Sequence, residues 1–176
     1  MKNTDNSNRA IPDPNITTLL RIGFVVIGKW KLESNSLQLI YTNDPKGKTA
    51  SEGGPALYAF AVDGMLKYVG KTNRVLCKRL NEYIKPGPSQ ATNQKCRDLI
   101  LQALQSGKAV EVYGFAPDLP FCFDEFRINL PAGLEDVLIE KMNPDWNGKQ
   151  TADKTAESKS TFIPSNPTEI LFPQRV

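Results

Sequence analysis

The stretch LYAFAVDGMLKYVG, residues 57–70, holds the strongest local signal in the chain. Two runs of strand-forming residues flank Asp63-Gly64. An Asp-Gly connection is typical of a type I′ turn, because that turn needs positive φ at both central positions, so the stretch predicts a β-hairpin. Counted outward from the turn, Val62 faces Met65. The face that each tyrosine of the hairpin takes stays open, because a slip of one residue reverses it.

The segments around this hairpin complete an α+β pattern. Apolar periodicity and turn residues predict a small central antiparallel β-sheet flanked by helices, with an N-terminal β extension. The chain divides into three parts: residues 1–54 (a flexible arm, then the extension), 55–147 (the main domain) and 148–176 (a polar tail). Residues 118–129 show no firm period. We expect strands over Leu19–Lys29, Leu37–Thr42 and Ala109–Phe115, and helices over Arg74–Ile84, from residue 89 or 92 to about Ser106, and over Pro131–Met142.

Composition narrows the class of protein. The 176 residues are 40% hydrophobic and 23% charged, which is ordinary for a globular domain and excludes a collagen or a coiled coil. No apolar run approaches the ~18 residues of a membrane span, so we expect no membrane partner. The chain starts with polar residues, and its three cysteines are widely spaced. We therefore expect no secretory signal and a cytoplasmic location.

The chain contains no histidine, which restricts the chemistry available to it. Histidine bases, Ser-His-Asp triads and histidine metal ligands are all excluded. Charge is unevenly distributed: residues 54–115 carry nine basic and four acidic side chains, and residues 116–147 carry two basic and seven acidic ones. This pattern fits a phosphate-facing surface beside a metal-binding one. The alternative is simple charge balance between two helical faces.

Residues 56–72 resemble the paired motif of the GIY-YIG nuclease family. Ala56-Leu57-Tyr58 stands for its first half, with Ala-Leu in place of Gly-Ile, and Tyr68-Val69-Gly70 for its second. The resemblance covers about residues 55–147. It extends to an arginine on the helix after the hairpin, a glutamate on the last helix and a closing Pro-x-x-Asn segment, which are Arg79, Glu135 and Pro144–Asn147 here.

The resemblance implies a metal-dependent DNA endonuclease and a role for each matched residue. In the family, a glutamate holds one divalent ion and a tyrosine activates water. Tyr58 would then be the general base, with Tyr68 positioning it or sharing that role. Arg79 would stabilise the phosphate, Glu135 would bind Mg²⁺ (or Mn²⁺), and Asn147 would support the site.

Lys71 is expected to help the base. The reference pKa of tyrosine, about 10, is too high for a base at neutral pH. A nearby cation lowers it by favouring the phenolate. Lys71 is close in sequence to the Tyr68 end of the hairpin, so it is the candidate for this effect.

Tyr83 suggests a subclass. In the branch of the family that includes type II restriction endonucleases, a histidine or tyrosine follows the arginine by four residues, as Tyr83 follows Arg79. The resemblance therefore favours a restriction enzyme acting on double-stranded DNA. Two subunits, each with one site, are the simplest way to cut both strands, so a homodimer is expected. The side chains expected to grip DNA are Lys29, Trp30, Lys31, Arg74 and Lys78.

Each of these residues also has a purely structural interpretation. Tyrosines in strands usually pack, Tyr83 can extend an apolar stripe, and Trp30 can be buried. A glutamate early in a helix is favoured by the helix dipole. The degenerate first half-motif is the best support for a non-catalytic nucleic-acid-binding module. A repair or homing nuclease of the same family is a further alternative.

Overall fold

The computed structural model describes residues 13–42, 54–117 and 121–148. A five-stranded antiparallel sheet has the order β2-β1-β5-β3-β4. Its strands are β1 (Val25–Glu33), β2 (Ser36–Tyr41), β3 (Ala56–Val62), β4 (Met65–Thr72) and β5 (Val110–Phe115). The predicted N-terminal extension therefore belongs to the central sheet: β1 pairs with β5 of the main domain. The α+β class predicted from the sequence is confirmed.

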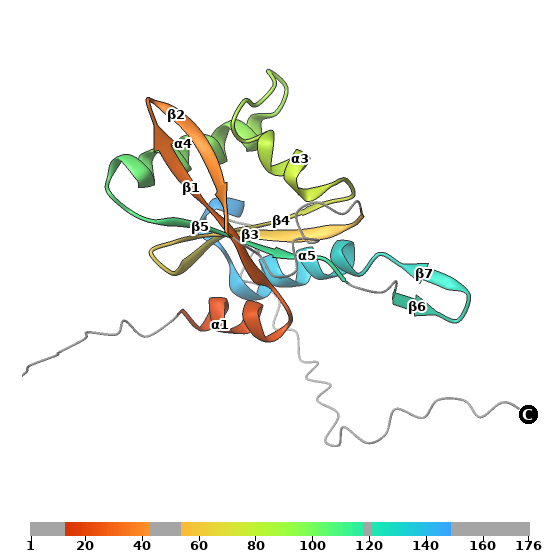
Figure 1. Ribbon diagram of the computed structural model, residues 1–176. Coiled ribbons are helices and arrows are strands. Elements are labelled where there is room, and N and C mark those ends of the chain that lie inside the picture. The colour runs from red at the N-terminus through yellow and green to blue at the C-terminus, as the bar shows by residue number, and fades with distance from the viewer. Residues whose placement is uncertain (1–12, 43–53, 118–120, 149–176) are drawn as a thin grey trace, which may run out of the picture.

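Helices cover both faces of the sheet (Figure 1). On one face, α3 (Leu76–Asn81) and α4 (Ala91–Gln105) pack on a core that contains Trp30 and Phe60. On the other face, α1 (Pro14–Arg21) and α5 (Leu130–Met142) pack on a second core. Strand β3 lies between the two layers, and every one of its residues is buried. A short 3₁₀ helix, η1 (Asp145–Asn147), follows α5 and contacts β4.

The predicted hairpin is confirmed, with one irregularity that the sequence did not reveal. Asp63 and Gly64 have φ of 49° and 76°, as a type I′ turn requires. Val62 pairs with Met65, but the register then shifts, so that Phe60 pairs with Tyr68. The shift is a β-bulge that leaves Lys67 as the extra residue. Since neighbouring positions in a strand point to opposite faces, the bulge turns Tyr68 to the face of the sheet that also holds Phe60.

The strand predicted over Leu19–Lys29 is wrong at its start. The chain forms α1 there, and β1 begins only at Val25. A local signal explains the helix: the Asp13 carboxylate accepts the backbone N–H of Asn15 at 2.9 Å, and proline occupies the first helical position. Asp13 also accepts the N–H of Leu66 at 2.8 Å, which ties α1 to the central hairpin.

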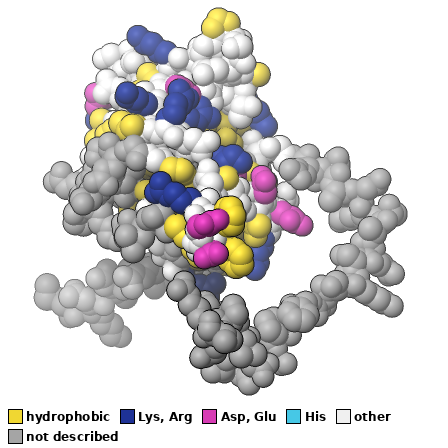
Figure 2. All heavy atoms as spheres, turned by 90° about the vertical axis from the view of Figure 1, so that its right-hand side faces the viewer, with side chains coloured by type: hydrophobic (Ala, Val, Ile, Leu, Met, Phe, Trp, Pro, Cys, Tyr) yellow, Lys and Arg dark blue, Asp and Glu magenta, His cyan; other side chains and the backbone are white. Residues whose placement is uncertain are grey.

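A second hairpin lies where the sequence showed no firm period. Strands β6 (Phe121–Phe123) and β7 (Phe126–Ile128) have three residues each, too short for a periodic pattern to register. All six residues are exposed, and the hairpin projects from the body beside α5 (Figure 1). Figure 2 presents the face to which it points, where basic side chains gather in the upper part and acidic and apolar ones in the lower part.

The remaining predicted elements agree closely with the structure. Strand β2, strand β5, helix α4 and helix α5 match their predicted ranges to within two residues. Helix α3 is shorter than the predicted 74–84, and hydrogen-bonded turns continue the chain as far as Ile84. The predicted arm up to residue 12 and the tail from 149 lie outside the described residues. Among the described helices, none has the length and apolarity needed to cross a bilayer.

Candidate active site

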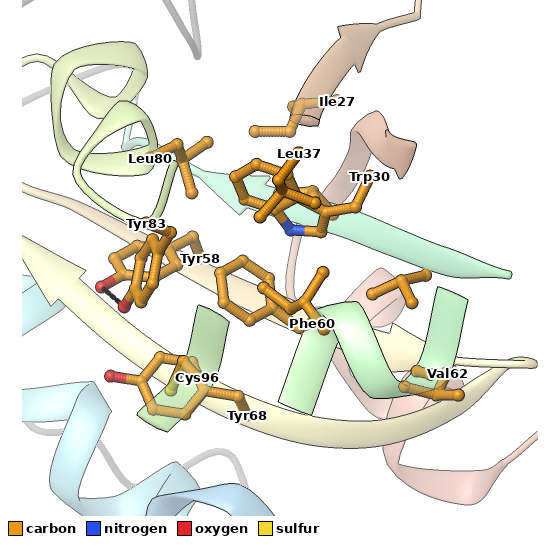
Figure 3. Packing of buried hydrophobic residues seen from close by; sticks show 14 of the residues in the cluster. Ile27, Trp30, Leu37, Tyr58, Phe60, Val62, Tyr68, Leu80, Tyr83 and Cys96 are labelled. Atoms are coloured by element: carbon orange, nitrogen blue, oxygen red, sulfur yellow. Dashed lines mark hydrogen bonds between the residues drawn. The ribbon is translucent and has the colours of Figure 1, made fainter. Parts of the chain in front are cut away.

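Two tyrosines and an arginine meet at the end of α3 (Figure 3 shows the tyrosines). Tyr58 reaches out from β3, and Tyr83 follows α3; their hydroxyl oxygens share a hydrogen bond of 2.8 Å. Arg79 donates from Nε to the Tyr58 hydroxyl at 3.0 Å and from Nη2 to the Tyr83 hydroxyl at 3.2 Å. Its guanidinium also lies 4.9 Å from the centre of the Tyr83 ring. One cation therefore contacts both phenol oxygens.

Tyr68 completes the cluster. Its ring centre lies 6.1 Å from that of Tyr58 and 6.4 Å from that of Tyr83. The bulge at Lys67 accounts for this position, because without it Tyr68 would face the opposite core. All three tyrosines are buried, at 0 to 6% exposure. The structure thus brings together four of the residues singled out from the sequence.

Gly70 makes room for the two motif tyrosines. A Cβ atom at this position would lie 2.7 Å from the Tyr58 ring and hydroxyl and 2.8 Å from the Tyr68 ring. Gly70 is also the strand partner of Tyr58. The glycine of the second half-motif is therefore required by packing, since any larger residue would displace both phenols.

Lys71 and Glu135 form an ion pair between β4 and α5. Lys71 Nζ lies 2.7 Å from Glu135 Oε2, and the Glu135 side chain is 16% exposed. Lys71 follows Gly70 directly, so the pair lies at the same end of the hairpin as Tyr58, although it faces α5. The hydrogen bond to Glu135 raises the pKa of Lys71. The positive charge of Lys71 is thus directed at a carboxylate.

Burial controls the ionisation of the phenols, contrary to the expectation from sequence. Desolvation raises the pKa of Tyr58, although the charge and hydrogen bond of Arg79 act in the opposite direction. Desolvation likewise raises the pKa of Tyr68 and of Tyr83. The predicted lowering by a nearby cation is therefore outweighed, and the phenols are neutral at neutral pH.

Asn147 acts on the backbone of β4. Its side-chain oxygen accepts the N–H of Val69 at 2.9 Å, and its Nδ2 donates to the carbonyl of the same residue at 2.7 Å. The amide thus replaces a neighbouring strand along the outer edge of the sheet. Lys67 adds an ion pair of 2.6 Å to Asp145 of the same 3₁₀ helix. Asn147 therefore holds the edge strand β4, which carries Tyr68, in place.

The residues expected to grip DNA separate into two groups. Lys29, Lys31, Arg74 and Lys78 are exposed. Trp30 is 2% exposed and packs edge-on against Phe60, with 6.0 Å between ring centres. The alternative interpretation of Trp30 as a core residue is the observed one, because the strand alternation that exposes its two lysine neighbours turns the indole inward.

The donor set for a metal ion is sparse. The described residues contain no group of three or more Cys, Asp or Glu side chains that could hold a metal ion. Glu135 offers a single carboxylate, which Lys71 also contacts. Mg²⁺ is commonly bound through one or two carboxylates, with waters and substrate phosphates as the other ligands. Glu135 therefore fits a site that a bound substrate would complete.

Glu82 is a residue of the site that sequence analysis missed. Its carboxylate accepts from Arg79 at 2.7 Å and from Arg74 at 2.6 Å. The only signal in the sequence was its position three residues after Arg79, a spacing at which helical side chains meet. Gly70 was seen as part of the motif, but its contact with the phenols depends on the register of the sheet.

Comparison with known proteins identifies the fold through solved structures. No protein-family model matches the chain, and no curated protein matches it. The fold is nonetheless nuclease-like. The structure of a Glu-to-Ala mutant of bacteriophage T4 EndoII is similar, with 25% sequence identity and a TM-score of 0.57. The match covers 75% of this chain and 97% of the EndoII chain. A second match is restriction endonuclease HPY188I in complex with product DNA, with 17% sequence identity and a TM-score of 0.45. This match covers 82% of this chain and 87% of the HPY188I chain.

Proposed function

We propose that this chain is a divalent-metal-dependent endonuclease of the GIY-YIG type that hydrolyses phosphodiester bonds of double-stranded DNA. The observation that carries the proposal is the meeting of Tyr58, Arg79 and Tyr83, three residues that the motif orders along the sequence. The similarity to T4 EndoII over most of both chains supports it. The contact between Arg79 and Tyr83 supports the restriction-type subclass.

Tyr58 is the proposed general base. Arg79 Nε lies 3.0 Å from its oxygen, so the guanidinium opposes the desolvation that keeps this phenol neutral and favours the phenolate that would take a proton from water. Arginine has five N–H donors, and Arg79 uses three of them on Tyr58, Tyr83 and Glu82. The remaining two are available to a phosphate oxygen. Arg79 can therefore serve the base and the phosphate at once.

Glu135 is the proposed metal ligand, and Lys71 a phosphate-binding residue. A divalent ion at Glu135 would stabilise charge on the phosphate and on the leaving oxygen. Lys71 is 39% exposed, and its only ion-pair partner in the described part of the chain is Glu135. A DNA phosphate would offer Lys71 a second negatively charged oxygen group, besides the Glu135 carboxylate.

A plasmid cleavage assay tests the proposal. We expect discrete Mg²⁺-dependent products from the wild type and no cleavage in EDTA. Glu135→Ala should abolish cleavage and leave DNA binding nearly intact. Glu140→Ala, an exposed glutamate on the same helix, is the matched control and should cleave like the wild type. Cleavage retained by Glu135→Ala would contradict the assignment.

A non-catalytic nucleic-acid-binding module is the second candidate. The burial of Tyr58 and Tyr83 and the pairing of Lys71 with Glu135 favour it, because they close off both the base and the metal ligand. This candidate predicts a retarded band that weakens steeply with salt, and intact DNA under every metal condition.

A homodimer remains part of the proposal. One site per subunit and two strands to cut make two subunits the simplest arrangement. Sedimentation analysis across a range of concentrations, with and without DNA, tests it. A monomer on duplex DNA that still cuts both strands would contradict it.

A further inference from the structure

A single carboxylate links the buried phenol cluster to the surface of the protein. Glu82 Oε2 accepts from Arg79 Nη1 at 2.7 Å, and Glu82 Oε1 accepts from Arg74 Nη2 at 2.6 Å. The side chains of Arg79 and Glu82 are 17% and 21% exposed, whereas that of Arg74 is 63% exposed. The three residues thus form a short network that starts at the phenols and ends in solvent.

Glu82 restrains the orientation of the Arg79 guanidinium. The phenols contact this planar group at Nε and Nη2, and Glu82 contacts it at Nη1. A planar group held at three of its nitrogens cannot rotate without breaking a hydrogen bond. Glu82 is also the only anionic partner of Arg79 in the described residues. Because Glu82 is an anion, its bond joins two opposite charges and is therefore stronger than the two bonds from Arg79 to the neutral phenols.

The charge state of Glu82 keeps this network intact. Burial by itself would raise the pKa of Glu82, but hydrogen bonds from Arg79 and Arg74 outweigh it and lower the pKa below its usual value. Glu82 is therefore an anion throughout the neutral range, and it can hold both guanidinium groups.

We propose that Glu82 is a positioning residue that orients Arg79 for the phosphate, and that Arg74 is the arm of the same network that engages DNA. This inference rests on the proposed nuclease function. A DNA phosphate competes with Glu82 for the exposed Arg74, because both are oxygen anions suited to a guanidinium. When Arg74 turns to DNA, Glu82 retains Arg79 as its sole partner. Contact between Arg74 and DNA therefore strengthens the hydrogen bond from Arg79 to Glu82, and with it the orientation of the Arg79 guanidinium beside Tyr58.

Steady-state cleavage by single variants tests the two roles separately. Glu82→Gln conserves shape and removes the charge; we expect kcat to fall about 10-fold or more with KM little changed, as for loss of one charge-assisted hydrogen bond. Arg74→Gln should raise KM about 10-fold and leave kcat near the wild-type value, because it removes binding alone. Glu125→Gln, exposed at the turn between β6 and β7, is the control and should match the wild type.

A second measurement needs neither DNA nor metal. In isotope-labelled protein, the Nε–H of Arg79 should give an NMR signal protected from exchange by its bond to Tyr58. We expect Glu82→Gln to remove that protection and Glu125→Gln to keep it. A purely structural Glu82 would lower thermal stability without changing the Arg79 signal or the split between kcat and KM.

The outcomes separate this inference from the proposed function. Wild-type kcat and an unchanged Arg79 signal in Glu82→Gln overturn the inference while the nuclease stands. If the wild type leaves all DNA intact, the nuclease proposal fails, and the Arg79 signal still decides whether Glu82 positions the guanidinium. An unchanged signal in that case overturns the inference as well.

Discussion

The hydroxyl oxygens of Tyr58 and Tyr83 lie 2.8 Å apart, although 25 residues separate them in the chain. Arg79 donates to both, so two buried phenols and one partly exposed cation share a polar site at the edge of an otherwise apolar core. A buried polar group is costly unless it is hydrogen-bonded. Each member of this trio therefore supports the others.

Removal of the Tyr58 hydroxyl should separate catalysis from packing. Tyr58→Phe keeps the ring and deletes the base, so we expect cleavage to fall about 100-fold or more. The free energy of unfolding of this variant should drop by about 1–3 kcal/mol, since Tyr83 and Arg79 each lose a hydrogen-bond partner. Thermal melts and cleavage rates are the measurements. Tyr113→Phe, which loses a bond to Glu111 outside the cluster, should keep its cleavage rate; wild-type cleavage by Tyr58→Phe would exclude Tyr58 as the base.

Gly70→Ala should damage the fold at the phenol cluster. The added methyl would lie 2.7 Å from the Tyr58 ring, so we expect a loss of about 1–3 kcal/mol in the free energy of unfolding, as for overpacking of a core. Gly133→Ala is the contrast, because no atom lies within 4 Å of its Cβ position. It lies in α5, where alanine is favoured over glycine by about 1 kcal/mol. Denaturant melts of the two variants should therefore move in opposite directions.

The five tyrosines should resist ionisation in the native protein. Burial raises the pKa of Tyr58, Tyr68, Tyr83 and Tyr113, and partial burial raises that of Tyr41, whose side chain is still 41% exposed, to about 12. In the unfolded chain they titrate near 10. A group whose pKa is raised on folding binds its proton more tightly in the native state. Stability is therefore retained below pH 10 and lost as the pH rises beyond it.

Near-ultraviolet absorbance, recorded as a function of pH, measures the ionisation of the tyrosines directly. Native protein should show little phenolate at pH 10, whereas protein in guanidinium should titrate all its tyrosines near that pH. Tyr58→Phe should reduce the loss of stability at alkaline pH, because one shifted group is gone. A native titration that coincides with the denatured one would contradict the burial of the cluster.

Lys71 and a metal ion should compete for Glu135. Lys71→Met removes a cation 2.7 Å from the carboxylate, so we expect Mn²⁺ to bind more tightly to this variant. Cleavage should nevertheless fall if Lys71 binds a phosphate. Lys67→Met, which breaks the pair with Asp145 instead, is the control and should leave Mn²⁺ affinity unchanged. Weaker Mn²⁺ binding in Lys71→Met would argue against Glu135 as the metal ligand.

Asn147 should affect stability more than chemistry. Asn147→Ala leaves the N–H and carbonyl of Val69 without their side-chain partner, so we expect a loss of about 1–3 kcal/mol in the free energy of unfolding. Hydrogen exchange at Val69 should accelerate in the variant. Cleavage measured well below its melting temperature should stay within a few-fold of wild type. A loss of cleavage as deep as that of Glu135→Ala would instead place Asn147 in the reaction itself.

The sequence predicted those parts of the fold whose signals are local. Asp63-Gly64 specified the hairpin, because few residues other than glycine and asparagine or aspartate tolerate positive φ. Helices α4 and α5 follow apolar periodicity, which reflects one buried face per helix. The strand predicted at Leu19 is wrong because apolar residues alone do not distinguish a short helix from a strand, whereas the cap at Asp13 starts a helix here.

The motif named most of the candidate site, but it did not specify contacts. Tyr58, Tyr68, Arg79 and Tyr83 meet as a group, as the resemblance led us to expect. The state of the phenols was not predictable, because the pKa of a buried tyrosine depends on desolvation as well as on neighbouring charge. Glu82 was not predictable, since its spacing of three residues from Arg79 is common among charged side chains on helices and does not mark a site.

By itself, the sequence determined the order of elements and the identity of the chemical groups, because turns, caps and periodicity act over a few neighbouring residues. The tertiary structure decided which groups meet. The bulge at Lys67 shifts the register by one residue, and that single step places Tyr68 beside Tyr58 instead of in the opposite core. Both faces of the hairpin are covered by a core, so Tyr68 would be buried in either register and the local alternation does not reveal the shift.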